Sequence, residues 1–377
     1  MKYMGSKAAL LRGPLGNRIL AMLDPKERFV DLFTGSASVS HFVAESSAVP
    51  VWSVDLQHYS KVLSESVITR TEPISDRQVV TDWVKSTLEA INGDEHYRQL
   101  AEPIHRLGRT TVLRSRKKSA AAPQNFFITA QYGGHYFSSQ QAYFLDSLYQ
   151  TLPEEKSERA VGLAALLRTA SSCAAAPGHT AQPFQPTPQL LPFIKTAWSK
   201  DVGLEVQREV EYLSGRSAKR RGAAFVADAT GFASQLNSGD LVFCDPPYSD
   251  AQYSRFYHVL EGISQGGWSD VGGAGRAPQR SERASSAFSM RSQSNSAITA
   301  LLAALRSAGC TVMITFPDAS ASNGLSGREI VEIASREWLV EVDLVDSIHS
   351  TMGGSKQAGG RGGRRRLQEA VLCLQPR

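Results

Sequence analysis

The four residues Asp245-Pro246-Pro247-Tyr248 have the clearest chemical potential in this chain, and they directly follow the apolar run 241–244. This run predicts a buried strand, which ends at the prolines because proline has no N–H group to donate to a sheet. Each proline also restricts the residue before it, so the turn is stiff. Asp245 and Tyr248 are therefore expected at the carboxyl end of a strand, where open α/β sheets bind ligands. This arrangement suits a flat heterocycle with an exocyclic amine; an ordinary turn between a strand and a loop is the alternative.

A second candidate site lies near the amino terminus, where the apolar run 29–33 leads into the small-residue turn 34–37 (Thr-Gly-Ser-Ala). A turn of small residues before a helix lets the backbone approach a ligand and offers free N–H groups. Residues 51–54 predict the next strand, and Asp55 at its end occupies the place where nucleoside-binding sheets hold ribose hydroxyls. Asp55 is equally a candidate for capping the helix that follows.

Three motifs along the chain resemble one family. Residues 2–7 (Lys-Tyr-Met-Gly-Ser-Lys), 31–40 (Asp-Leu-Phe-Thr-Gly-Ser-Ala-Ser-Val-Ser) and 245–248 are similar, in sequence and in order, to the motifs of the alpha-class, Dam-like N6-adenine DNA methyltransferases. Members of this family have the cofactor motifs first, then a target-recognition insert, then the catalytic tetrapeptide. Residues 131–138 and 249–261 are similar to members that belong to restriction-modification or defence systems.

This resemblance implies S-adenosylmethionine as the cofactor and double-stranded DNA as the substrate. Two residues near the amino terminus match positions at the methionine end of the cofactor, and three residues in and directly before the small-residue turn match the turn beneath it. Three aspartates match positions at its ribose and its adenine ring. The expected cofactor-binding residues are Tyr3, Lys7, Phe33, Gly35, Ser36, Asp55, Asp228 and Asp245.

The tetrapeptide offers a way to activate an adenine amine, which is a poor nucleophile because its lone pair is conjugated with the ring. The Asp245 carboxylate and the Pro246 carbonyl can accept both amine hydrogens, and both acceptors are fixed before the reaction. Tyr248 can stack on the base, which contributes ~1–3 kcal/mol. We therefore predict Asp245, Pro246, Pro247 and Tyr248 as catalytic residues that need no metal, no covalent intermediate and no separate base. The target adenine has to flip out of the duplex to reach them.

Basic residues followed by aromatic residues mark a candidate DNA-binding region between the cofactor motifs and the tetrapeptide. Cations suit phosphates and aromatic rings suit bases, whereas a solvated loop beside core aromatics is the alternative. An arginine and a tyrosine after the tetrapeptide can line the channel for DNA. We expect a structural role for the nearby His258, because the proposed chemistry has no task for an imidazole. The predicted DNA-binding residues are Arg109, Arg114, Arg116, Lys117, Lys118, Tyr132, Tyr136, Arg255 and Tyr257.

The order of the expected elements predicts an α/β fold of the class I methyltransferase type. It consists of a doubly wound, mostly parallel sheet with an antiparallel C-terminal hairpin, plus a helical target-recognition insert. We expect helices at 79–91, 140–149, 158–176, 298–307 and 328–336, a strand at 310–316, and a hairpin of 339–348 with 368–374.

The same pattern predicts how the chain is divided. Residues 1–60 and 221–377 form the expected catalytic, cofactor-binding domain, and residues 61–220 form the helical insert. The segment 266–296 is rich in Gly, Ser and Arg and has few apolar residues, so we expect a mobile loop there.

The composition agrees with a nucleic-acid enzyme without requiring one. The chain has 377 residues, 42% of them hydrophobic, and a net charge of only +5. The four cysteines are scattered without paired spacing, so neither a zinc site nor a disulfide framework is expected. No stretch has the length and hydropathy of a membrane span, and the start lacks the pattern of a signal peptide. A cytoplasmic, nucleoid-associated enzyme is the expectation.

The function expected from these features is sequence-specific N6-adenine methylation of double-stranded DNA. The alternatives are a methyltransferase for cytosine N4 or for a protein glutamine, and a non-catalytic DNA-binding subunit of a restriction or defence complex. The first two usually carry Ser or Asn in place of Asp245, and the intact Asp245 and Tyr248 argue against the third. A cognate restriction or defence protein is a candidate partner.

Overall fold

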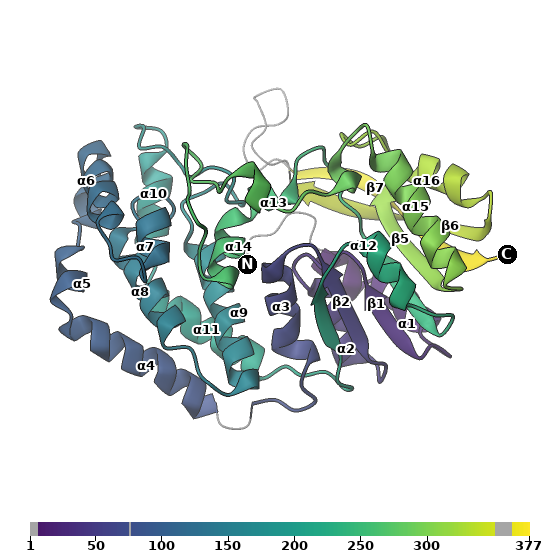
Figure 1. The fold of residues 1–377 in the computed structure, drawn as a ribbon, viewed down its shortest axis with the longest axis horizontal. Helices are drawn as coiled ribbons and strands as arrows, with labels where there is room; N and C mark the ends of the chain where they lie inside the picture. The colour runs from purple at the N-terminus through teal and green to yellow at the C-terminus, as the bar shows by residue number, and fades with distance from the viewer. Residues whose placement is uncertain (1–6, 75–76, 351–363) are drawn as a thin grey trace. The chain divides into compact units, whose positions relative to one another are not determined.

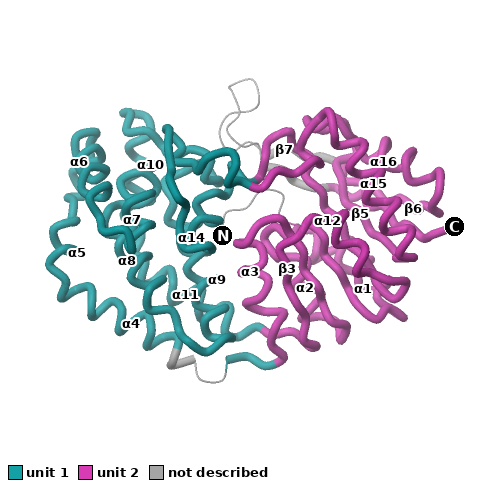
Figure 2. Tube along the Cα trace, viewed as in Figure 1, with its two compact units in different colours: residues 1–3, 72–216, 254–283 teal, residues 4–71, 217–253, 284–377 magenta. Residues whose placement is uncertain are grey.

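The computed structural model describes residues 7–74, 77–350 and 364–377 (Figure 1). The chain divides into two compact units, which are coloured separately in Figure 2. We call the first the sheet unit; it comprises residues 4–71, 217–253 and 284–377. We call the second the helical unit; it comprises residues 72–216 and 254–283. Tyr3, an expected cofactor-binding residue, lies outside the described residues.

The sheet unit contains one seven-stranded sheet with the order β3-β2-β1-β4-β5-β7-β6. Strands β1 to β5 pair in parallel, and β7 runs antiparallel to both β5 and β6. This sheet confirms the predicted fold class, including the C-terminal hairpin. The strands are β1 (Arg28–Asp31), β2 (Val51–Asp55), β3 (Ala223–Val226), β4 (Asp240–Cys244), β5 (Thr311–Pro317), β6 (Trp338–Ser350) and β7 (Arg364–Pro376).

Alternate residues of the central strands face two separate hydrophobic cores, one on each face of the sheet. Val242 and Cys244 of β4 lie in one core, whereas Leu241 and Phe243 lie in the other. All residues of β4 are buried, as expected for a parallel strand that is covered on both faces. An apolar run without polar alternation is therefore the sequence signal of this strand.

The reversal of strand order beside β1 creates the place where a ligand is expected. Strand β1 pairs with β2 on one side and with β4 on the other. Doubly wound sheets bind ligands at such a switch point, outside the carboxyl ends of the strands. The turn 34–37 follows β1 and the tetrapeptide 245–248 follows β4, so both sequence motifs lie at this point.

Helices cover both faces of the sheet. Apolar side chains of η1, α1 and α2 contribute to the core that contains Phe243, and those of α12, α15 and α16 contribute to the core that contains Val242. The predicted helices at 298–307 and 328–336 correspond to α15 and α16. The helices of the sheet unit are η1 (Lys7–Arg12), α1 (Pro14–Met22), α2 (Ser38–Ser46), α3 (His58–Ile68), α12 (Ala229–Phe232), η3 (Ala233–Gln235), η5 (Ala287–Ser289), α15 (Ser294–Ser307) and α16 (Gly327–Ala334).

The described part of the helical unit is formed by helices and their connections. The predicted helices at 79–91 and 140–149 correspond to α4 and α8, and the helix expected at 158–176 ends earlier, at Cys173, because Ala174 leaves the helical conformation. The helices are α4 (Arg77–Gly93), α5 (Glu95–Gln99), η2 (Ile104–Arg106), α6 (Arg109–Ala120), α7 (Phe127–Tyr132), α8 (Ser139–Gln150), α9 (Lys156–Cys173), α10 (Leu191–Trp198), α11 (Val202–Ser214), α14 (His258–Gln265) and η4 (Arg280–Glu282). The short helix α13 (Tyr253–Phe256) spans the boundary with the sheet unit.

The boundaries of the units differ from the expected domains in two respects. Residues 61–71 and 217–220, expected in the insert, belong to the sheet unit, whereas residues 254–283, expected in the catalytic domain, belong to the helical unit. Hydrogen bonds explain the second difference: Gln131 of α7 donates to the Trp268 carbonyl at 2.8 Å, and Arg276 donates to the Gln131 carbonyl at 2.8 Å. The segment 266–296, expected as one loop, is therefore shared between the two units.

Candidate active site

The turn after β1 has the conformation that a close approach to a ligand requires. Gly35 and Ala37 both have left-handed backbone, with φ values of 52° and 60°. Glycine adopts this region readily, whereas a residue with a side chain is strained there by about 1–3 kcal/mol. Ala37 is completely buried, so the surrounding packing maintains it in this conformation.

Asp31, at the end of β1, stabilises this turn through hydrogen bonds to its carboxylate. Its carboxylate accepts hydrogen bonds from the Phe33 backbone N–H at 3.3 Å and from the Ser40 hydroxyl at 2.7 Å. Ser53 donates to Ser40, and Ser64 donates to Ser53, so a buried chain of hydroxyl groups ends on Asp31. Burial, together with the nearby charges of Asp245 and Asp55, raises the pKa of Asp31 to about 7, although the hydrogen bonds from Ser40 and Phe33 act in the opposite direction. Asp31 and Asp55 end β1 and β2, and Asp245 directly follows β4, so three aspartates lie at the carboxyl ends of three adjacent strands.

Asp55 connects the turn to the end of β2. Its Oδ2 accepts a hydrogen bond from the Gly35 N–H at 2.8 Å, and its Oδ1 accepts one from the Gln57 N–H at 3.0 Å. Gln57 Oε1 is buried and has no hydrogen-bond partner among the described residues. An acidic group and an orphan buried acceptor at this strand end suit the hydroxyl donors of a ribose.

The remaining cofactor candidates lie around the same strand ends. Phe33 contacts Phe288 edge to face, with 5.1 Å between ring centroids. The Ser36 and Ser38 hydroxyls lie 2.8 Å apart. Asp228, at the end of β3, is exposed and caps α12 by accepting from the N–H groups of Thr230 and Gly231 at 3.0 Å each. Its role at the cofactor stays a prediction.

Asp245 is held by protein groups at one of its two oxygens. Lys7 Nζ lies 2.9 Å from Oδ1, and the Thr315 hydroxyl donates to the same oxygen at 2.9 Å. Oδ2 accepts no hydrogen bond from any residue that the structure describes. The side chain is 16% exposed, so the oxygen without a partner is accessible to an incoming donor. This division leaves Asp245 rigid and still able to accept one further hydrogen bond.

A buried cation lies between two carboxylates at this site. Lys7 is 4% exposed and contacts both Asp245 and Glu369 of β7, which is 1% exposed. Burial alone would lower the pKa of Lys7, but the two carboxylates outweigh this effect and raise it. Burial raises the pKa of Asp245; attraction to Lys7 lowers it and repulsion from Glu369 raises it again. Lys7 is therefore charged, and Asp245 ionises less readily than an exposed aspartate.

The tetrapeptide is fixed by further contacts of buried residues. Asn323, which is completely buried, donates to the Pro247 carbonyl at 2.9 Å and to the Phe288 carbonyl at 3.0 Å. The Tyr248 ring lies edge to face with Phe316, with 6.4 Å between centroids, and Lys7 Nζ lies 6.0 Å from the Tyr248 centroid. The stiffness expected from the prolines is thus reinforced by side chains distant in the sequence.

Asp55 bonds to the turn 34–37 and Lys7 contacts Asp245 after the adjacent strand β4, while the roles of these residues at a cofactor stay predictions. The sequence did not identify Thr315, Asn323 and Glu369, which support the tetrapeptide. A threonine within an apolar strand and a glutamate on a hairpin have no local signal of function. The placement of Thr315 one residue before Phe316, in the strand adjacent to β4, is visible only once the strand order is known.

The candidate DNA-binding cations of α6 fall into two groups. Arg109 and Lys117 are exposed. Arg114 and Lys118 both contact the Glu102 carboxylate, at 2.6 and 3.0 Å, and half-buried Arg116 donates to the Gly134 carbonyl at 3.0 Å. The latter three residues thus have structural contacts within the helical unit. Arg255 of α13 is exposed.

The structure contradicts the prediction that Tyr132, Tyr136 and Tyr257 contact DNA. Their exposed fractions are 0%, 0% and 1%, and a ring without exposed surface cannot stack on a base. The rings of Tyr132 and Tyr136 pack edge to face at 5.9 Å, and the Tyr136 hydroxyl donates to the Gly275 carbonyl at 2.7 Å. These tyrosines are core residues of the helical unit, which is the alternative that the sequence had left open.

His258 belongs to the same core. It is completely buried, and its ring nitrogens lie 3.0 Å from the carbonyls of Arg255 and Gly275. Burial lowers the pKa of His258 to about 4, while the backbone contacts act in the opposite direction. These contacts are consistent with a structural role.

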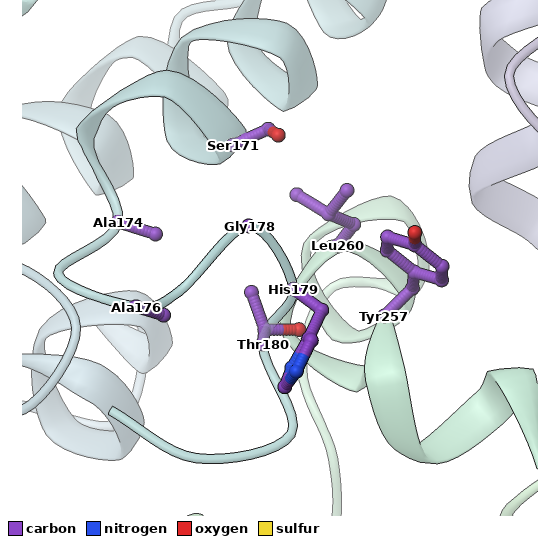
Figure 3. A pocket seen from close by; sticks show the side chains of 8 residues that line it. All are labelled: Ser171, Ala174, Ala176, Gly178, His179, Thr180, Tyr257 and Leu260. Atoms are coloured by element: carbon purple, nitrogen blue, oxygen red, sulfur yellow. The ribbon is translucent and has the colours of Figure 1, made fainter. Parts of the chain in front are cut away.

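A small cavity of the helical unit is too small for a base (Figure 3). Its volume of about 10 Å³ is about the space that one water molecule needs. The Tyr257 and Leu260 side chains lie on one side of it, opposite the chain segment that follows α9. The lining residues are Ser171, Ala174, Ala176, Gly178, His179, Thr180, Tyr257 and Leu260.

No cluster of three or more His, Cys, Asp or Glu side chains fit to hold a metal occurs within residues 7–74, 77–350 and 364–377. In the same described ranges, none of the helices combines the length and hydropathy of a bilayer span.

Comparison with known proteins agrees with this geometry. Residues 3–144 and 221–304 match the family model of the D12 class N6 adenine-specific DNA methyltransferases. The chain is also 22% identical, over 388 aligned residues, to Modification methylase LlaI of Lactococcus lactis subsp. lactis. That alignment covers 99% of this chain and 54% of the relative, so the chain spans about half the length of the curated relative that it matches. Because the family model covers more than half of the chain, including the turn after β1 and the tetrapeptide after β4, the chain belongs to the D12 class N6 adenine-specific DNA methyltransferases.

Proposed function

We propose that this chain transfers a methyl group from S-adenosylmethionine to the N6 amine of an adenine that has flipped out of double-stranded DNA at a specific sequence. The observation that supports the proposal is the different environment of the two Asp245 carboxylate oxygens. Lys7 and Thr315 hold its Oδ1, while Oδ2 has no hydrogen-bond partner in the described chain. A rigid carboxylate with one available oxygen suits an incoming N–H donor.

The tetrapeptide would activate the amine by binding both of its hydrogens. Asp245 Oδ2 accepts one hydrogen and the Pro246 carbonyl accepts the other, which favours a tetrahedral nitrogen with a free lone pair. Both acceptors are preorganised, because Asn323 holds the next carbonyl and Thr315 holds the carboxylate. Tyr248, anchored against Phe316, stacks on the extruded base.

The cofactor would lie at the switch point. Asp55 and the buried Gln57 Oε1 would accept from its ribose hydroxyls, and the left-handed turn at Gly35 and Ala37 would leave room beneath it. When bound, S-adenosylmethionine supplies an electrophilic methyl group on a cationic sulfur. The gathered carboxylates around this place favour a cation.

A direct assay tests the proposed function. The chain is incubated with double-stranded DNA and S-adenosylmethionine that carries a labelled methyl group, and the DNA is digested to nucleosides. The expected product is N6-methyladenine. Label on cytosine, or label on protein alone, would overturn the proposal. Mapping of methylated sites in the genome of a host that expresses the chain would show the sequence specificity.

The partners and place of action follow from the proposed substrate. An enzyme that modifies genomic DNA acts in the cytoplasm, at the nucleoid. The relative is called a modification methylase, which favours a cognate restriction or defence protein as a partner. Loss of viability of a host that carries the neighbouring genes but lacks this chain would support such a partner, and full viability would contradict it.

We predict that methyl transfer fails at acidic pH. Burial raises the pKa of Asp245 from its ordinary value near 3.8 to about 6, and only the carboxylate form accepts at both oxygens. Activity is therefore present above this pKa and is lost as the pH falls through it, with about tenfold loss per pH unit once the acid form predominates. The measurement is kcat/KM between pH 5 and pH 8, with circular dichroism as a control for folding. A profile without a decline between pH 7 and pH 5 would contradict the assignment.

We further predict that exposed cations of α6 contact phosphates. Arg109 and Lys117 lie two turns apart on one face, and the exposed Leu113 lies between them. The double variant Arg109→Ala with Lys117→Ala should lower the slope of log K against log salt by about 2, because each lost phosphate contact contributes about 0.9. Fluorescence anisotropy with labelled duplex DNA measures this slope. Arg208→Ala serves as the control, because Arg208 of α11 is equally exposed but lies beside Glu205. An unchanged slope in the double variant would exclude α6 as a DNA-binding helix.

A further inference from the structure

The C-terminal hairpin supplies a buried charge to the candidate active site. Glu369 lies on β7, opposite Pro317 of β5 and Val345 of β6, and its side chain is 1% exposed. Oε1 contacts the ammonium group of Lys7, and Oε2 is buried with no hydrogen-bond partner among the residues described. A buried ion pair is often no more stable than apolar residues of similar volume, so stability alone does not explain a carboxylate at this place.

Lys7 is the contact that Glu369 and Asp245 share, and the charge of Glu369 also acts on Asp245 by repulsion. The Lys7 ammonium contacts both carboxylates, and its distance to Asp245 Oδ1 is 2.9 Å. With Lys7 charged, the group of three carries one positive and two negative charges when both acids are ionised. Neither Glu369 nor Thr315 lies in the ranges that match the family model, which are residues 3–144 and 221–304.

We propose that Glu369 is a positioning residue that acts on Asp245 through Lys7. The proposal rests on the proposed function and adds a residue to it. By sharing the Lys7 ammonium, Glu369 keeps this cation from pairing with Asp245 alone. Lys7 thereby holds Oδ1 at a fixed place, with Thr315 as second donor, while Oδ2 retains enough negative charge to accept from an amine.

The charged groups near Asp245 determine how the loss of Glu369 would change the pKa of Asp245. Among the residues that the structure describes, the ionisable groups that act on Asp245 or respond to its charge include Lys7 of η1, Glu369 of β7, Asp31 of β1, Cys244 of β4 and Tyr253 of α13. Asp31 and Cys244 are uncharged when protonated, and burial favours that form of both. Glu369 is therefore the acid whose removal changes the balance at Lys7.

The test uses Glu369→Gln, which keeps the shape of the side chain and removes its charge. Lys7 then pairs with Asp245 alone, so we expect the acidic limb of the pH profile to move to lower pH by roughly 1 unit. We expect the plateau value of kcat to fall about 10-fold, with KM for DNA unchanged. The reason is that Asp245 Oδ2 would be displaced or would carry less negative charge, and would therefore bind the reacting amine less well. Glu369→Asp should recover part of kcat.

A matched control separates this effect from a loss of stability. Asp240 is also a buried carboxylate of the sheet, at the opposite end of β4, and it pairs with Arg28 through two bonds of 2.7 Å. Asp240→Asn should lower the melting temperature without moving the pH profile. If Glu369→Gln leaves both kcat and the acidic limb at the wild-type values, or changes only the melting temperature as Asp240→Asn does, the proposal is wrong.

A second measurement does not depend on activity. Urea unfolding of Lys7→Met, Glu369→Gln and the double variant forms a mutant cycle. Lys7→Met leaves Glu369 buried without its cation, and this penalty is absent once Glu369 is replaced by Gln, so the double variant should lose less stability than the sum of the two. Additive losses would show that the pair is not formed and would overturn the proposal even in an active enzyme. If the mutant cycle shows strong coupling but the wild-type chain does not methylate adenine, the proposed function is refuted. The Lys7–Glu369 ion pair would then still be supported.

Discussion

Asp245→Ala is expected to lower kcat for methyl transfer by on the order of 10³-fold or more while DNA binding persists. The substitution removes the acceptor for one amine hydrogen and with it the charge-assisted hydrogen bond, which is about twice as strong as a neutral one. Lys7 keeps Glu369 as its partner, so the ammonium is not left alone in the core. Single-turnover methylation of a duplex substrate measures the loss.

The control for this variant lies a few residues further along the same loop. Asp250 is exposed, and the Ser322 hydroxyl donates to its carboxylate at 3.0 Å. Asp250→Ala should retain kcat. Anisotropy with duplex DNA should give similar affinities for wild type and both variants. Normal turnover of Asp245→Ala would show that the carboxylate has no part in the chemistry.

Asp55→Ala is expected to raise the Kd for S-adenosylmethionine by on the order of 10²-fold. The carboxylate accepts from Gly35 N–H and Gln57 N–H, so its loss releases the turn beneath the cofactor as well as the proposed contact to ribose. A hydrogen bond to a charged group contributes about 1.5–3 kcal/mol, and about 2.7 kcal/mol corresponds to the expected change in Kd. Isothermal titration calorimetry with the chain alone measures this constant.

The control for Asp55 is an aspartate that caps a helix. Asp201 caps α11 of the helical unit by accepting from the Leu204 N–H at 3.0 Å. Asp201→Ala should cost about 1 kcal/mol of stability, as cap removal does, and leave cofactor binding intact. Equal affinities of wild type and Asp55→Ala would place the ribose elsewhere.

The order of helices and strands could be predicted from the sequence because it depends on local patterns of apolar residues. Apolar runs such as 241–244 are buried on both faces in a parallel strand, and the periodic apolar residues of α4 and α8 identify helices. The predicted ends were less accurate, as at Cys173, where the apolar composition continues beyond the helix. Nothing in the local pattern indicated that residues 254–283 join the helical unit, since that depends on bonds of Trp268 and Arg276 to residues far away in the sequence.

The burial of the tyrosines after α6 is a second feature that the local sequence pattern could not predict. Aromatic residues beside cations are typical both of nucleic-acid surfaces and of core residues next to a surface helix. Tyr132 and Tyr136 proved to be core residues because α7, α14 and the segment near Gly275 surround them. Only the packing of several separate segments distinguishes the two cases.

By itself the sequence determined the family, the sheet, and the two motifs that end β1 and β4, because these depend on residue type and on spacing along the chain. The tertiary structure alone decided which oxygen of Asp245 is held and which is available. That outcome depends on three distant segments, because Lys7 and Thr315 both contact Asp245 Oδ1 and Glu369 contacts Lys7. Contacts of this kind have no local sequence signal, since the strand order β4-β5-β7 creates them.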